Sequence, residues 1–392
     1  MEELSNPGGP IRDSPATGKF PPFLLENWIR EYRGRCTLDI GGSDVQALTL
    51  ENLLRNADDH ALEAWRSVAL GYGSNAGPSQ LRALIAELYE GIDEDGIRVL
   101  SGTTEAFFAT ALATLPRGGH VIVVGPTYQL LSGVFEAAGA KVTVVEMVFD
   151  EGWKLDLDRL SAAWRPDTTV VVLNNPNNPT GTVYDPRSVS ALATLAGDRG
   201  AYLIMDEIYG GVGRSNENGR TGVKLGPHVV SLGGLSKVYG LAGLRVGWVA
   251  SSDRALLERI RDIRYWTTLT NGVINEILAR MALRQRHGLL ARARAILHNN
   301  EGLLRQFIER HSDIIEWSPP TGGTTAYPRL HRGDSSTISQ RLAVDYGIFT
   351  VPSSVVPSAG QHLRIGLGRT DVPRALEIMD EALPALIKSA HL

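Results

Sequence analysis

One lysine of this chain stands in surroundings that could turn it into a nucleophile. Lys237 lies in the stretch SLGGLSKVYGLAGLRVGWVA at 231–250, among several glycines and shortly before Arg245. A lone lysine is usually a surface charge, but a lysine amine attacks a carbonyl when burial or a nearby cation lowers its pKa. The stretch follows an apolar strand, and α/β folds bind ligands at the carboxyl ends of strands. These residue types therefore indicate covalent carbonyl chemistry at Lys237.

Other polar residues also follow apolar runs. Asp206 comes near the end of the run AYLIMDE at 201–207, where a carboxylate can pair with a cation or cap a loop. The segment SGTTEA at 101–106 opens a helix, and backbone N–H groups at a helix start bind phosphate; a plain N-cap is the alternative. The segment NNPNNPTG at 174–181 predicts a turn after a strand. Each of these signals is weak when taken alone.

The elements that must position these residues alternate between β-branched runs and helical stretches from about 50 to about 285. Runs that are apolar on both faces and separated by helices are typical of a buried, mostly parallel sheet. We therefore predict about seven strands, at 97–100, 120–125, 141–147, 169–175, 201–207, 228–232 and 245–251. We also predict helices over 21–34, 77–90 and, as one long element, 275–312.

Length, charge and composition exclude several classes of protein. The 392 residues suffice for two or three domains, and 43% hydrophobic residues exclude a disordered chain. A net charge of −4 argues against a nucleic-acid or membrane-surface binder, and no apolar run reaches the ~18 residues that span a bilayer. The acidic start lacks the apolar core of a signal peptide, so we expect a cytoplasmic protein. Cys36 alone forms neither a disulfide nor a zinc site, so we expect a small buried side chain and no metal.

The chain is expected to divide into two domains with flanking segments. A Pro-, Gly- and Ser-rich composition predicts a mobile arm over 1–24, followed by a segment over 25–48 that packs with the small domain. A large domain over 49–285 precedes an interdomain helix and a small C-terminal domain over 286–392. The arginines of 275–312 could contact nucleic acid, but at this net charge we prefer a solvated helix face.

Together these motifs resemble the class I/II aminotransferases, a family of fold-type I pyridoxal-phosphate (PLP) enzymes. The family's lysine segment reads S-x-S-K and then G-x-R-x-G, and Ser236, Lys237 and GLRVG at 243–247 match it. Gly234 replaces the first serine, so one contact to the cofactor phosphate is missing or comes from elsewhere. The resemblance covers about 25–390 and implies an α/β, aspartate-aminotransferase-like fold, with about seven mostly parallel strands in a large domain and a smaller α+β domain.

The resemblance also implies a role for each matched residue. Lys237 would hold PLP as a Schiff base and act as general base, while Asp206 would keep the pyridine nitrogen protonated so that the ring withdraws electrons from Cα. Asn178 and Tyr209 would share the 3-oxygen. Other matches are expected at the cofactor (Thr103, Thr104, Tyr128, Ser236, Arg245 and, from the neighbouring subunit, Tyr72) and at the substrate carboxylate (Arg364, Gly41, Gly42 and Asn178). The position of Tyr72 implies a homodimer with shared active sites.

Two reactions on a small-molecule amino acid are compatible with these motifs. Segments at 24–32, 38–45 and 321–330 are most similar to capreomycidine synthase and related cyclases of hydroxylated arginine. That similarity implies Cα deprotonation to a quinonoid, loss of a leaving group at Cβ or Cγ, and cyclisation or replacement. The segment DEIYGG at 206–211 has the ordinary aminotransferase form, so amino transfer to a 2-oxo acid is the alternative.

A cyclase of this kind needs a carboxylate that faces the guanidinium of its substrate. Asp39, Asp44 and Glu51 lie near the N-terminal segment that closes over the substrate in the family, so they are the candidates for this contact.

Overall fold

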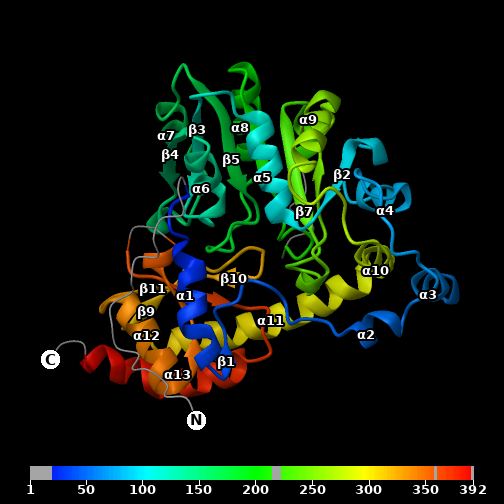
Figure 1. Cartoon of the computed structure of the whole chain (residues 1–392). Coiled ribbons are helices and arrows are strands. Elements are labelled where there is room, and N and C mark those ends of the chain that lie inside the picture. The colour runs from blue at the N-terminus through cyan, green and yellow to red at the C-terminus, as the bar shows by residue number, and fades with distance from the viewer. Residues whose placement is uncertain (1–19, 214–221, 357–359, 390–392) are drawn as a thin grey trace, which may run out of the picture.

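A seven-stranded sheet forms the centre of the structure, a computed structural model that describes residues 20–213, 222–356 and 360–389 (Figure 1). The strand order is β2-β8-β7-β6-β5-β3-β4, in which β8 is antiparallel to both of its neighbours and all other pairs are parallel. The strands are β2 (Ile97–Leu100), β3 (His120–Gly125), β4 (Lys141–Glu146), β5 (Thr168–Asn174), β6 (Tyr202–Asp206), β7 (Val229–Gly234) and β8 (Gly247–Ala250). The predicted seven-stranded, mostly parallel sheet is therefore confirmed.

Helices cover both faces of this sheet because successive side chains of its strands point to opposite faces. In β3, Val121 and Val123 belong to one apolar core, whereas Ile122 and Val124 belong to the other. The first core is closed by α5 (Thr103–Thr114), α6 (Leu130–Ala137) and α9 (Arg254–Arg264), and the second by α7 (Leu157–Ala162) and α8 (Pro186–Asp198). The strand β4 differs from the prediction of burial on both faces: it is an edge strand, and Val144 is exposed.

Aspartate side chains start several of these helices. Asp185 accepts a hydrogen bond from the backbone N–H of Ser188, and Asp253 accepts one from Leu256. Each contact satisfies a donor that the first turn of a helix leaves unpaired, and each places a negative charge at the positive end of the helix dipole. The short sequence signals Asp-Pro-Arg and Asp-Arg thus set where α8 and α9 begin.

A second group of elements lies in the lower part of Figure 1, around α11 (Arg286–Arg310), α12 (Ser335–Tyr346) and α13 (Val372–Ser389). Its short strands pair as β10-β14-β13, β1-β12 and β11-β9. They are β1 (Leu38–Asp39), β9 (Ile315–Glu316), β10 (Thr325–Ala326), β11 (Arg329–Leu330), β12 (Ile348–Phe349), β13 (Val351–Pro352) and β14 (Leu363–Gly366). The N-terminal helix α1 (Leu24–Tyr32) confirms the predicted helix over 21–34.

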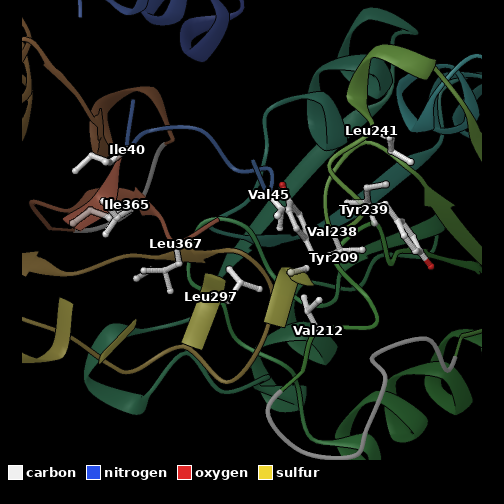
Figure 2. Packing of buried hydrophobic residues seen from close by; sticks show 14 of the residues in the cluster. Ile40, Val45, Tyr209, Val212, Val238, Tyr239, Leu241, Leu297, Ile365 and Leu367 are labelled. Atoms are coloured by element: carbon white, nitrogen blue, oxygen red, sulfur yellow. The ribbon is translucent and has the colours of Figure 1, made fainter. Parts of the chain in front are cut away.

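One apolar core joins the two groups of elements. Figure 2 shows Tyr209 and Val238, which follow strands of the sheet, in the same cluster as Ile365 of β14 and Leu297 of α11. Arginines of α11 add polar links: Arg292 donates to the carbonyl of Gln46, and Arg294 donates to that of Gly211. The elements around the sheet and those around α11 are therefore packed against each other. The domain boundaries set from the sequence stay a prediction.

The long helix predicted over 275–312 is two helices. Helix α10 (Val273–Arg284) ends before Gln285, and α11 begins directly after it. The helix predicted over 77–90 is also shorter, because α4 (Ser79–Ala86) begins after Pro78 and ends in turns. The helices α2 (Leu50–Leu54) and α3 (Asp59–Arg66) precede α4. Most of the arm predicted over 1–24 lies outside the described residues.

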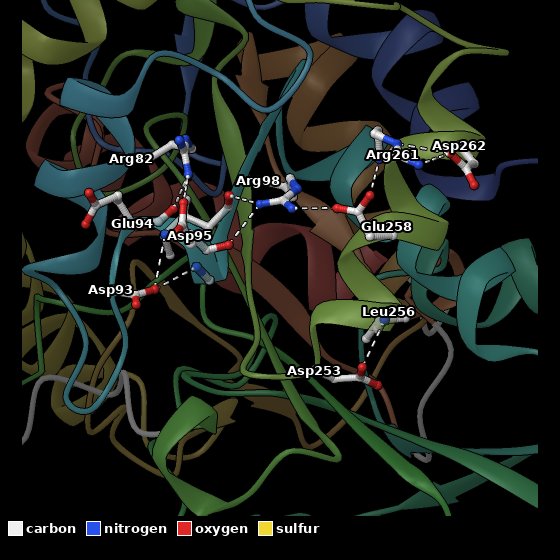
Figure 3. A network of polar contacts seen from close by, with 12 residues as sticks. Arg82, Asp93, Glu94, Asp95, Arg98, Asp253, Leu256, Glu258, Arg261 and Asp262 are labelled. Carbon is white, nitrogen blue, oxygen red and sulfur yellow. Dashed lines mark hydrogen bonds and ion pairs between the residues drawn. The ribbon is translucent and has the colours of Figure 1, made fainter.

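The antiparallel edge of the sheet is held by a polar network (Figure 3). Arg98 of β2 donates to Glu258 of α9 over 3.0 Å, and Arg254 of α9 donates to Asp93 over 2.8 Å. These contacts fix α9 to the strand that leads into α5. Among the described residues, no helix is long and apolar enough to cross a membrane.

Replacement of Phe135 by Ala tests the core between the sheet and α5. The ring of Phe135 is fully buried and meets Phe107 edge to face at 5.8 Å. We expect the Phe135→Ala variant to lose about 3–5 kcal/mol of unfolding free energy in urea denaturation. The control, Phe108→Ala, removes a partly exposed ring next to Phe107 and should lose clearly less. Equal losses would contradict this description of the core.

Candidate active site

A cavity of about 440 Å³ opens where the ends of β5 and β6, the start of α5 and the turn after β7 face α1. It brings together residues that are far apart in the sequence. Of the predicted site residues, the cavity is lined by Gly41, Gly42, Thr103, Thr104, Tyr128, Asn178, Asp206, Tyr209, Ser236, Lys237, Arg245 and Arg364. Tyr72 does not line it: it lies in the loop before α4 with 88% of its surface exposed.

Lys237 is half-buried in the turn that follows β7. Its Nζ donates to the hydroxyl of Ser43 over 3.0 Å, and its carbonyl accepts the backbone N–H of Val45 over 3.1 Å. The segment 41–45 is thus fixed to the lysine by a side chain and by the backbone. Sequence reasoning did not identify Ser43, although its neighbours Gly42 and Asp44 were both named as candidates for contacts with the substrate.

Asp206 ends β6 as a buried carboxylate. Burial raises the pKa of Asp206 to about 6, while the N–H of Ile208, which donates to Oδ1 over 3.2 Å, and the charge of Lys237 act in the opposite direction. Asn174 at the end of β5 donates to the carbonyl of Asp206 over 2.9 Å, so the ends of neighbouring parallel strands are tied together. A buried carboxylate with a raised pKa is suited to hold a proton or a cationic N–H group.

Arg364 of β14 is a buried cation without a carboxylate at salt-bridge distance among the described residues. Its Nη1 donates to Asn178 Oδ1 over 3.2 Å and its Nη2 to the carbonyl of Gly41 over 2.8 Å, whereas Nε has no partner. The backbone N–H of Asn178 in turn donates to Asn174 Oδ1 over 2.7 Å. An unpaired donor on a buried guanidinium that lines a cavity is suited to bind an anion there.

The start of α5 forms a second anion-binding corner. Gly102 has a φ of +85°, a backbone conformation that favours glycine, and the absent Cβ atom leaves room for Arg245 Nη2, which would lie 2.5 Å from it. Arg245 lines the cavity together with Thr103 and Thr104, at the positive end of the α5 dipole. The Thr103 hydroxyl donates to the carbonyl of Gly233 over 3.0 Å, which leaves Thr104 and the backbone N–H groups as donors.

The departure from the family pattern at Gly234 has a steric reason. A Cβ atom at this position would lie 2.5 Å from Thr103 Oγ1 and 2.9 Å from Ile208 Cδ1. A serine at position 234 would therefore require the side chains of Thr103 and Ile208 to shift, and in this chain the threonine oxygen occupies this space. In this chain Thr103 places a hydroxyl oxygen next to the backbone of β7 instead.

Tyr128 stands on the side of the cavity that faces α1. Its hydroxyl donates to Glu26 Oε1 over 3.0 Å, and its ring lies 5.3 Å from that of Phe23. Burial and the neighbouring Glu26 carboxylate raise the pKa of Tyr128. Glu26 was missed by sequence reasoning, since only the fold brings α1 to the segment after β3.

The three carboxylates proposed for a guanidinium have other partners. Asp39 pairs with Arg33 at 2.6 Å, and Asp44 pairs with Arg369 at 2.5 Å. Glu51 is exposed on α2, pairs with Arg55 at 3.1 Å and does not line the cavity. Asp39 and Glu51 do not line the cavity, which corrects this part of the sequence interpretation, whereas Asp44 lines the cavity beside Arg369 and stays a prediction.

Cys36 is half-buried rather than fully buried. Burial raises the pKa of its thiol to about 11, so the thiol is protonated and unreactive at neutral pH.

The buried Asp206 predicts a pH dependence of stability in the cofactor-free chain. The pKa of Asp206 is about 6 in the folded protein and 3.8 for the ordinary side chain, so between these values the folded protein holds a proton that the unfolded chain releases. The contribution of Asp206 to the free energy of unfolding therefore falls by up to about 3 kcal/mol as the pH rises from 4 to 6. The Asp206→Asn variant lacks this dependence. In urea denaturation of the cofactor-free proteins, we expect the variant to be more stable than wild type at pH 7.5 and to lose this advantage near pH 4. A difference that does not change with pH would contradict the assignment.

Comparisons with known proteins agree with this geometry. The aminotransferase class I and II family matches residues 38–377. Capreomycidine synthase of Streptomyces vinaceus is 30% identical over 96% of both chains. A PLP-dependent aminotransferase from Streptococcus suis superposes with a TM-score of 0.88, at 28% identity over 94% of this chain and 99% of the other. The PLP-dependent cyclase OrfR superposes with a TM-score of 0.85, at 28% identity over 96% of this chain and 99% of the other. The chain therefore belongs to the aminotransferase class I and II family, whose fold is that of PLP-dependent, aspartate-aminotransferase-like enzymes.

Proposed function

We propose that this protein is a PLP-dependent enzyme that acts on an L-amino acid, and that it cyclises the amino acid or replaces a leaving group at Cβ or Cγ. The observation that carries the proposal is the match to capreomycidine synthase over 96% of both chains, together with a cavity that keeps every expected cofactor residue of a single subunit. Biosynthesis of a specialised metabolite is the role that this relative suggests, and we expect a cytoplasmic location.

The donor set of the cavity fits PLP. The buried carboxylate of Asp206 suits a protonated pyridine nitrogen, and the corner of Thr104 and Arg245 at the start of α5 suits a phosphate. Asn178 and Tyr209 line the cavity between these two sites and Arg364, where they suit the 3-oxygen of the ring. Bound PLP supplies an aldehyde that condenses with amines and a ring that withdraws electrons from the substrate Cα.

The side chains of this chain would then position the substrate and move its protons. Arg364, held by Asn178 and by the carbonyl of Gly41, binds the α-carboxylate with its unpaired donor. Lys237 removes the Cα proton, and the Ser43 hydroxyl, 3.0 Å from Nζ, holds the amine in place. The segment 41–45 covers both groups, so it limits the access of water to the reacting atoms.

An ordinary aminotransferase is the second candidate. The specific observation in its favour is the Streptococcus suis aminotransferase, whose TM-score of 0.88 is slightly higher than the 0.85 of the cyclase. All the cofactor residues are compatible with amino transfer, because Lys237 could return the proton to the cofactor instead of supporting the loss of a leaving group. The fold alone does not choose between these two outcomes.

Turnover without a 2-oxo acid distinguishes the two reactions. Holoenzyme is incubated with arginine, hydroxylated arginines and γ-substituted amino acids, and the products are followed by mass spectrometry. We expect many turnovers per active site and a product mass that identifies the leaving group. A conversion that stops after one equivalent and resumes when a 2-oxo acid is added would show an aminotransferase. The Lys237→Ala variant is the control and should be inactive on every substrate.

We further propose that the enzyme is a homodimer with shared active sites. Tyr72 and Trp266 are 88% and 91% exposed, and their segments touch where Asn75 donates to the carbonyl of Leu269 over 2.7 Å. Beside them opens a second cavity of about 670 Å³, which shares Arg245 and Thr104 with the first. Large exposed apolar side chains next to an open site are typical of an interface, and a second copy of the chain would bring Tyr72 to the phosphate corner.

Replacement of Trp266 by Glu tests this interface. A charge buried between subunits destabilises them, so we expect the Trp266→Glu variant to sediment as a monomer and to bind PLP at least tenfold more weakly. The matched control is Val344→Glu, which changes an exposed apolar residue of α12 and should remain dimeric. A wild-type protein that is fully active as a monomer would overturn the shared site.

A further inference from the structure

One side of helix α1 lines the cavity, and it carries a carboxylate that forms no ion pair with any described residue. Leu25, Glu26 and Ile29 line the cavity from one side of this helix, and so does Arg33, which follows its last turn. We propose that Glu26 is a specificity-determining residue that binds a cationic side chain of the substrate, a guanidinium or an ammonium group. This inference rests on the proposed function, because it assigns the substrate class of that same site.

The other charged groups near the N-terminal side of the cavity have ion-pair partners, so Glu26 is the carboxylate best placed to bind a cationic substrate group. Arg33 is neutralised by Asp39 at 2.6 Å, and the other acid on the N-terminal side, Asp44, is neutralised by Arg369 at 2.5 Å. Asp206 is buried at the end of β6, where it would pair with the pyridine nitrogen of the cofactor in the proposed function. Among the described residues, Glu26 has no ion-pair partner, and its carboxylate accepts a hydrogen bond from the hydroxyl of Tyr128 over 3.0 Å. Its carboxylate can therefore accept further charged donors.

Two sets of contacts hold Glu26 in this position. Trp28 of the same helix donates to the carbonyl of Thr350 over 3.0 Å, which fixes α1 to the elements around α12. At its other end, the backbone N–H of Leu24 donates to Gln129 Oε1 over 2.9 Å, next to Tyr128. Glu26 itself is exposed, but these contacts fix the helix that carries it and Tyr128 donates a hydrogen bond to its carboxylate. A carboxylate positioned in this way binds a planar guanidinium well.

The position of Glu26 agrees with the geometry expected for a bound amino acid. Arg364 and Lys237 define where the α-carboxylate and the Cα lie, on the deep side of the cavity. The rest of the lining includes residues of α1 together with Tyr128, and a substrate side chain that extends along this part of the cavity meets Glu26. A cation there meets one anionic side chain that is not neutralised.

A helix-stabilising role is the alternative explanation for Glu26. It lies in the first turn of α1, and an acidic side chain there stabilises the helix by interaction with its dipole. That role requires no substrate contact. It predicts that a neutral amide at position 26 lowers the thermal stability of the protein and leaves the preference among substrates unchanged.

The test compares cationic and neutral amino acids of the same shape. Dissociation constants of arginine and citrulline, and of lysine and norleucine, are measured for the holoenzyme by calorimetry and by the absorbance of the bound cofactor. We expect wild type to bind the cationic member of at least one pair 10- to 100-fold more tightly, as for a charge-assisted hydrogen bond. In Glu26→Gln this ratio should fall to about 1, with the melting temperature unchanged. Glu26→Lys should invert the ratio.

Glu31→Gln is the matched control, because Glu31 lies on the same helix but does not line the cavity. It should keep the wild-type ratio. The inference is overturned if Glu26→Gln keeps the ratio of wild type, or if wild type turns over neutral amino acids without any preference for the cationic ones. In both cases the proposed function still stands. A holoenzyme that binds no amino acid at all overturns the proposed function itself.

Discussion

The arrangement of this site depends on a carboxylate that is buried at the end of a central strand. A buried Asp206 without a cation is costly, and the rise of its pKa to about 6 reflects that cost. The surrounding elements are organised around it: β5 ties its Asn174 to the backbone of Asp206, and β7 leads to Lys237 on the same edge of the sheet. A positively charged ring nitrogen is a suitable partner for this carboxylate, so in the function that we propose the position of one acid would determine how the cofactor is oriented.

The two groups of elements contribute different parts of the cavity lining. The sheet and α5 supply the lining residues that we propose for the cofactor, whereas α1, the segment 41–45 and β14 supply those that we propose for the substrate. Ser43, Arg364 and Glu26 all come from this second group. Two enzymes of the family can therefore share the cofactor site and differ in reaction, because the substrate-facing wall is built from separate parts of the chain.

Much of the fold could be predicted from sequence because its signals are local. β-Branched runs predicted the seven strands, and short motifs such as those around Lys237, Asn178 and Arg245 predicted about half of the cavity lining. Contacts between distant segments could not be predicted in this way. Glu26 meets Tyr128 across about a hundred residues of sequence, and Asp39 and Asp44 lie near the site but are neutralised by Arg33 and Arg369. The break at Gln285 carries neither glycine nor proline, so periodicity alone extended the helix through it.

The central claim is that Lys237 is the residue that binds the cofactor covalently. Reduction of the holoenzyme with borohydride, followed by proteolysis and mass spectrometry, tests it most directly because reduction makes the link permanent. We predict one phosphopyridoxyl group per chain, on the peptide that contains Lys237, and no label in Lys237→Ala. A label on another lysine, or a holoenzyme whose cofactor is not retained after reduction, would contradict the account.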